Sequence, residues 1–70
     1  MKQITGKVKW FRKKVGYGFI SGDNGKDYFV HYTQIADKTV SVLERGQIVK
    51  FNEQIVPGKN LKAIMVEIVE

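Results

Sequence analysis

Aromatic and basic side chains are concentrated in the first half of the sequence. Seven of the eight Phe, Tyr and Trp residues fall between Trp10 and Tyr32, and only Phe51 lies outside this segment. The first 32 residues also hold seven Lys or Arg against two acids, whereas residues 33–70 hold five of each, so the net charge of +5 belongs to the first half. Rings beside cations suit single-stranded nucleic acid, because unpaired bases stack on rings and phosphates attract cations.

Length and composition limit the class of protein. Seventy residues with 43% hydrophobic content predict one domain over residues 1–70. The sequence has no cysteine for a disulfide or a thiolate metal site, and no apolar run approaches the roughly 20 residues of a membrane-spanning helix. No apolar segment of signal-peptide length follows Met1. We therefore expect a soluble, cytoplasmic domain that binds neither a membrane nor a small-molecule cofactor.

Catalytic constellations are not evident in the sequence. It contains one histidine, His31, and no paired carboxylate motif with a base nearby. Asp23 and Asp27 flank a predicted turn, where solvated carboxylates are the ordinary finding. A lone histidine without partner ligands does not predict a metal site. We expect a binding protein rather than an enzyme.

Alternating Val, Ile, Tyr and Phe residues predict an all-β fold of five short strands. These strands cover residues 3–11, 17–21, 27–32, 47–56 and 61–69. Tight turns are predicted at residues 23–25 and 57–58, single helical turns at 33–36 and 42–45, and a long connection at 36–45. Antiparallel strands in so small a chain would expose their edges, which closure into a barrel removes. A five-stranded antiparallel OB-type β-barrel is the first choice, and an SH3-like barrel is the second.

Strand alternation predicts which side chains fill the barrel. Neighbouring residues of a strand face opposite sides, so Tyr17 and Phe19 oppose Ile20, and Phe29 and His31 oppose Val30. The predicted interior is aliphatic and comprises Val8, Ile20, Val30, Ile35, Val49 and Val66. This choice leaves Tyr17, Phe19, Phe29 and His31 together on the outer surface.

An inward position for these rings is the main alternative, because aromatic residues on paired strands more often belong to a core. Three observations favour the outer surface. The opposite face is itself apolar, basic residues interleave with the rings, and Trp10-Phe11 directly precedes the basic cluster at residues 12–14. Glycines on both sides of Tyr17 suit the approach of a flat ligand as well as strand curvature.

Four segments together resemble the bacterial cold-shock protein family. They are GKVKWF at residues 6–11, GYGFI at 16–20, FVHY at 29–32 and LERGQIV at 43–49. The resemblance covers essentially the whole chain. It implies an OB-type barrel that binds single-stranded RNA and DNA and melts RNA secondary structure.

The resemblance also implies a set of ligand contacts. They are Lys9, Trp10, Phe11, Tyr17, Phe19, Asp27, Phe29, His31 and Tyr32. Arg12 joins them as a phosphate contact, because it stands beside the rings. For Asp27, a hydrogen bond to a base edge and a turn-closing hydrogen bond remain equal alternatives. Simple alternation would turn Trp10 inward with Val8, so a β-bulge near Trp10 is needed to display it. Tyr32 poses the same difficulty against Val30, which the end of a strand resolves.

The sequence departs from the family pattern at four places. Val15 replaces a lysine that the family usually carries, and residues 12–14 are basic where the family is polar or acidic. Val40 stands where many members have a phenylalanine, which removes one stacking platform. Tyr28 is bulkier than the common valine, and its hydroxyl requires a partner if it is buried.

Other binding functions remain open at this level. Another OB-type RNA-binding module is the nearest alternative, and an adaptor barrel that grips a proline-rich peptide is a different class. An RNA-recognition-motif domain is disfavoured because it needs two helices and the opposite order of motifs. We expect a monomer, and a weak or domain-swapped dimer also remains open.

Overall fold

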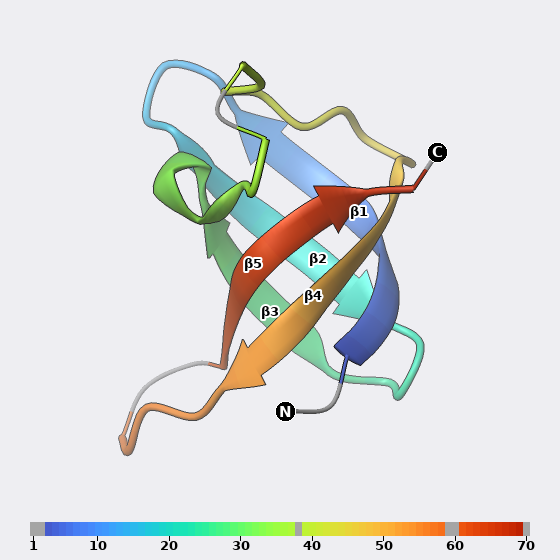
Figure 1. Cartoon of the computed structure of the whole chain (residues 1–70). Coiled ribbons are helices and arrows are strands. Elements are labelled where there is room, and N and C mark those ends of the chain that lie inside the picture. Colours follow the sequence, from blue (N-terminus) through green and yellow to red (C-terminus); the bar gives the residue numbers. More distant parts are fainter. Residues whose placement is uncertain (1–2, 38, 59–60, 70) are drawn as a thin grey trace.

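Five strands and one short helix account for the regular structure of the described residues. The computed structural model describes residues 3–37, 39–58 and 61–69; residue 38, in the predicted long connection, is outside this description. The elements are β1 (Gln3–Arg12), β2 (Tyr17–Gly22), β3 (Asp27–His31), the 3₁₀ helix η1 (Tyr32–Gln34), β4 (Ile48–Gln54) and β5 (Lys62–Ile68) (Figure 1). All five strands lie within two residues of their predicted bounds. No helix in the described ranges is long and apolar enough to cross a membrane.

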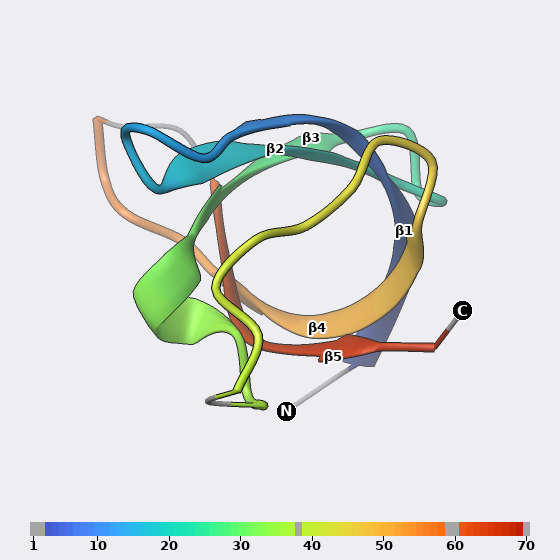
Figure 2. The same cartoon turned by 90° about the horizontal axis from the view of Figure 1, so that it is seen from above.

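The strands form a closed barrel in the order β1-β2-β3-β5-β4 (Figure 2). The predicted all-β, OB-type barrel is therefore confirmed. Four of the five strand pairs are antiparallel, whereas β3 and β5 pair in parallel. A ring of five strands that alternate in direction along the chain must bring two odd-numbered strands together, so one parallel pair is unavoidable.

Aliphatic side chains fill the interior, as alternation predicted. All six predicted interior residues are buried, and Tyr28, Leu43, Phe51 and Ala63 join them. Leu43 comes from the connection between η1 and β4, which crosses one end of the barrel in Figure 2. That connection therefore closes the core as well as linking two strands.

The predicted turns are present, with one difference. Residues 23–24 and 57–58 form turns, and the helical turn predicted at 33–36 begins one residue earlier as η1. The predicted helical turn at 42–45 is wrong, because the chain instead reverses sharply at Arg45 and Gly46. Gly46 has φ +90°, a conformation that glycine adopts without steric cost and that ends any helical path there.

Tyr28 is fully buried, and its hydroxyl has the partners that the sequence required. Its O–H donates to Oε2 of Glu53 at 2.8 Å, and its hydroxyl oxygen accepts from the Asn24 side-chain amide at 2.9 Å. Burial raises the pKa of Tyr28 above its usual value; the hydrogen bond from Asn24 opposes this shift, and Glu53 adds to it. This contact ties the β2–β3 turn to β4.

We expect Tyr28→Phe to lower the free energy of unfolding by about 1 kcal/mol, because both hydrogen bonds are lost. The raised pKa means that folded protein holds the phenolic proton more tightly than unfolded protein. This part of the stability is complete below about pH 10 and is lost as the pH rises through the folded-state pKa. Denaturant unfolding of both proteins from roughly pH 7 to 11 measures it. If the free energy of unfolding fell equally with rising pH in wild type and in Tyr28→Phe, this stability would not come from the Tyr28 hydroxyl.

Candidate nucleic-acid interface

A β-bulge at Lys9 changes which side chains at the end of β1 face outward. Val8 pairs with Ile20 and Trp10 pairs with Phe19, so β1 contains one more residue than β2 over this stretch. The extra residue reverses the alternation. Val8 is consequently buried while Trp10 is 37% exposed. The bulge that the sequence required for display of Trp10 is confirmed.

Four rings form a continuous cluster on the outer face of β1, β2 and β3. Trp10 contacts Tyr17 and Phe19 at centroid distances of 6.1 and 5.3 Å. Phe29 contacts the same two rings at 5.4 and 5.8 Å. We call Trp10, Tyr17, Phe19 and Phe29 the four-ring cluster. Its members other than Trp10 are half-buried, so the rings support one another and still present surface to solvent.

His31 and Tyr32 extend this surface at the end of β3. Their ring centroids are 4.7 Å apart, and Tyr32 is 45% exposed because it begins η1 rather than continuing the strand. The backbone N–H of Thr33 donates to Nδ1 of His31 at 3.3 Å. This contact holds the imidazole ring at the end of β3.

Cations lie beside the rings. The Arg12 guanidinium lies 5.7 Å from the centroid of the Trp10 ring, within cation–π range. Lys9 Nζ is 3.1 Å from Oδ2 of Asp27, and both side chains are about half exposed. An exposed ion pair of this kind contributes at most about 1 kcal/mol, so a phosphate can compete for Lys9. Asp27 is therefore the ion-pair partner of Lys9 in this structure.

Phe11 and Gly18 lie away from the ring surface. Phe11 is partly buried against the core, and it stands apart from the ring contacts described above. A Cβ at Gly18 would collide with the carbonyl oxygen of Trp10 and lie 2.7 Å from Cα of Phe11. Gly18 therefore permits close packing of β2 on β1, and the suggestion that it admits a flat ligand is not needed to explain it.

The β1–β2 turn contains Val15 and the basic residues Lys13 and Lys14, at which the chain departs from the family pattern. Lys13, Lys14 and Val15 line a cavity of about 290 Å³ with Tyr32 and part of the long connection. Val15 is 50% exposed, so this position faces solvent beside a ring. Val40, by contrast, packs against the core and offers no platform.

Pairing register extends the ring surface to residues that the sequence analysis missed. Trp10, Phe19 and Phe29 are cross-strand partners in one row, and Phe29 is in turn the partner of Lys62. Lys62 is the partner of Gln54 on β4. No local pattern marks these two residues, because only the closure of the barrel places them beside the rings.

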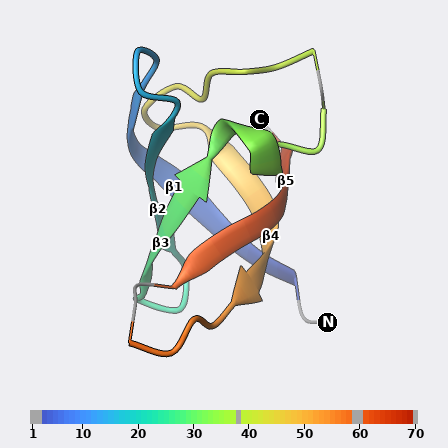
Figure 3. The ribbon, with the colours of Figure 1, turned by 90° about the vertical axis from the view of Figure 1, so that its left-hand side faces the viewer.

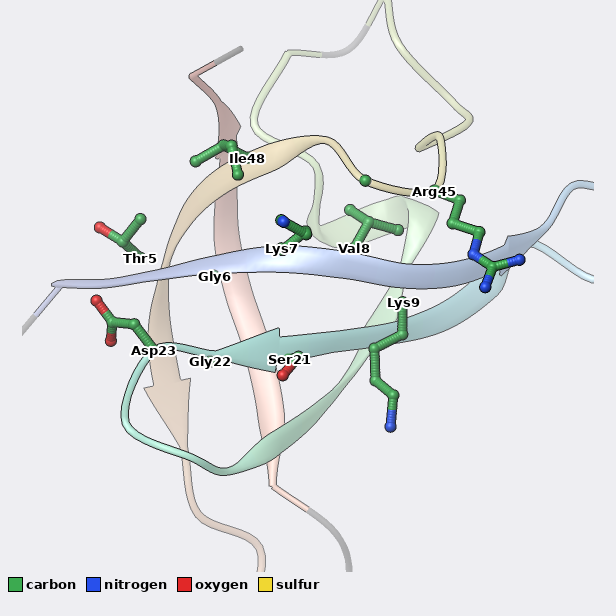
Figure 4. A pocket seen from close by; sticks show the side chains of 11 residues that line it. Thr5, Gly6, Lys7, Val8, Lys9, Ser21, Gly22, Asp23, Arg45 and Ile48 are labelled. Atoms are coloured by element: carbon green, nitrogen blue, oxygen red, sulfur yellow. The ribbon is translucent and has the colours of Figure 1, made fainter.

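A larger cavity lies next to the ring face. It measures about 640 Å³ and crosses β1, with Lys9 and Ser21 on one side and Arg45 and Ile48 on the other (Figure 4). It contains no aromatic side chain. Bases stack on a flat ring surface, so the larger volume of this cavity does not make it the stacking site. Among the described residues, no group of His, Asp or Glu could hold a metal ion.

A barrel with this outer surface has the architecture of nucleic-acid-binding OB-type domains. Comparison with known proteins gives the family. Residues 4–69 match the "'Cold-shock' DNA-binding domain". The chain belongs to the cold-shock domain family.

Similar proteins include cold shock protein CspB of Bacillus caldolyticus, 51% identical over 53 residues that cover 76% of this chain and 77% of that protein. The cold shock-like protein of Thermotoga maritima is 49% identical over 51 residues, or 73% of this chain and 77% of that protein. Cold shock protein CspD of Bacillus subtilis is 49% identical over 54 residues, or 77% and 79%. The family resemblance found in the sequence is confirmed, and family membership supports nucleic-acid binding.

Proposed function

We propose that this protein binds single-stranded RNA and DNA by stacking unpaired bases on its outer rings. The four-ring cluster, His31 and Tyr32 are the platforms, and Lys9 and Arg12 contact phosphates. The observation that carries the proposal is the exposure of these rings on a barrel whose interior is already filled by other residues.

The energetics favour unpaired strands. Stacking of a base on an aromatic side chain contributes roughly 1–3 kcal/mol, and the four-ring cluster offers several such contacts. A duplex hides the faces of its bases, so it can offer only its phosphates to the same surface. Phe11, whose ring is only partly buried, and Asp27, which can release Lys9, complete the proposed contact set.

Preference for unpaired strands is also the basis of the proposed RNA chaperone activity. A protein that binds only the open form of an RNA hairpin shifts the equilibrium toward that form in proportion to its free concentration and affinity. No catalytic step or cofactor is required. We propose that a monomer does this in the cytoplasm.

We expect Phe29→Ala to weaken binding to an oligo-dT strand by about 1–3 kcal/mol while the fold is retained, and Phe19→Ala to behave alike. Both rings are half-buried on the outer face. Oligonucleotide titration measures affinity, and circular dichroism with thermal unfolding monitors the fold. Phe51→Ala is the matched control, because that ring is fully buried and its loss must reduce stability instead. Unfolding of the Phe29 variant at ambient temperature would contradict an outer role.

Val15→Lys is expected to tighten binding and to steepen the dependence of log affinity on log salt concentration by about 0.7. The reason is one added phosphate contact from an exposed position beside Tyr32, in the turn that carries Lys13 and Lys14. Titrations at several salt concentrations measure the slope. Val15→Gln controls for side-chain length without charge. An unchanged slope in Val15→Lys would place position 15 away from the phosphate path.

A further inference from the structure

One cross-strand row of residues crosses all five strands of the barrel. Its members, as successive partners, are Trp10, Phe19, Phe29, Lys62 and Gln54. Neighbouring strands lie about 4.8 Å apart, so each step along the row is short. The row passes from three rings to a cation and then to an amide, and Lys62 and Gln54 are both exposed.

The row crosses the parallel seam between β3 and β5, which has the fewest paired residues of the strand pairs in the described barrel. These strands pair at Phe29 and Lys62, and a second, isolated bridge joins Ile35 to Val66. Between these points the strands diverge, with η1 above the space between them in Figure 3. A cavity of about 240 Å³ lies at this seam. It is smaller than the roughly 300–1,000 Å³ pockets that enclose a whole drug-sized ligand, and its size suits a single nucleobase.

Aromatic and polar groups share the walls of this seam cavity. Phe29 and His31 contribute ring surface, and Gln34, Gln54 and Lys62 contribute polar ends. Because Phe29 and His31 belong to the proposed stacking surface, the cavity is continuous with it. None of the residues that line it is acidic, so nothing in its wall repels a phosphate.

Three of the polar side chains that line the cavity are unpaired among the described residues. Within the part of the chain that the structure describes, the side-chain amides of Gln34 and Gln54 make no hydrogen bond, and Lys62 makes no ion pair. Each amide offers a donor and an acceptor side by side, which is the arrangement that pairs with the edge of a base. A lysine offers a point charge for a phosphate.

From these observations we propose that the seam cavity binds one nucleotide of the same strand that stacks on the rings. Gln34 and Gln54 read the edge of its base, and Lys62 holds its phosphate. The inference rests on the proposed function and adds base preference to it. Stacking alone tolerates every base, whereas an edge read by amides distinguishes them.

The test uses short dT strands that carry one variable nucleotide, A, C, G, T or an abasic site, at the 5′ end in one series and at the 3′ end in the other. At one of the two ends, the affinity of wild type for the best nucleotide is expected to exceed its affinity for the worst by about fivefold or more. The reason is that a bidentate amide–base pair is worth about 1–3 kcal/mol. The double variant Gln34→Ala with Gln54→Ala is expected to reduce this spread to about twofold or less. Its affinity for a dT strand too short to reach the seam stays at the wild-type value.

Lys62→Ala tests the phosphate contact separately. It is expected to lower affinity for every end nucleotide alike and to reduce the salt slope by about 0.7. Lys50→Ala is the matched control, because Lys50 is an exposed lysine of β4 whose cross-strand partner is Glu67, away from the row. It removes the same charge and is expected to leave the slope nearer the wild-type value.

Either of two results with the variants would overturn the inference while the proposed function stands. They are an unchanged base ranking in the double glutamine variant, and identical salt slopes for Lys62→Ala and Lys50→Ala. Equal wild-type affinity for all end nucleotides, abasic site included, would do the same. Failure of wild type to bind any dT strand would instead overturn the proposed function, and the seam subsite with it.

Discussion

The limited interior of a small closed barrel is the constraint on which the rest of the structure depends. A barrel of this kind encloses little more than one packed set of side chains, and aliphatic residues with Tyr28 and Phe51 already fill it. The rings of the four-ring cluster therefore cannot enter without displacing them. They lie outside, on the strands that also carry Lys9 and Arg12, and the surface they form is one that an unpaired strand can cover.

Local adjustments of the backbone make this surface continuous. The bulge at Lys9 turns Trp10 outward while Val8 stays in the core, and the end of β3 releases Tyr32 from the alternation that buries Val30. The same bulge places Lys9 where its amine reaches Asp27. The display of Trp10 and the placement of Lys9 are thus consequences of a single extra residue in β1.

Much of this arrangement could be predicted from the sequence because it depends on short-range patterns. The two-residue alternation of a strand places Ile20 and Phe19 on opposite faces, and Asn24-Gly25 predicts a turn. Neither inference needs information from the rest of the chain. The conflict between Val8 and Trp10 even indicated where a bulge must lie.

Long-range features were not accessible in the same way. The row from Phe29 to Lys62 and Gln54 exists only because the barrel closes through a parallel pair, and no local pattern encodes that register. The Lys9–Asp27 ion pair likewise depends on which residues face each other across three strands. The helical turn expected at 42–45 was wrong for a related reason, since the connection there must seat Leu43 in the core before reversing at Gly46.

Emission from Trp10 reports most directly on the central claim, that exposed rings stack on unpaired bases. Trp10 is the sole tryptophan of the chain, and its ring belongs to the four-ring cluster. The account predicts saturable quenching of its fluorescence by single-stranded oligo-dT and little change with a duplex of equal length. Unaltered emission with oligo-dT, or equal quenching by the duplex, would contradict it.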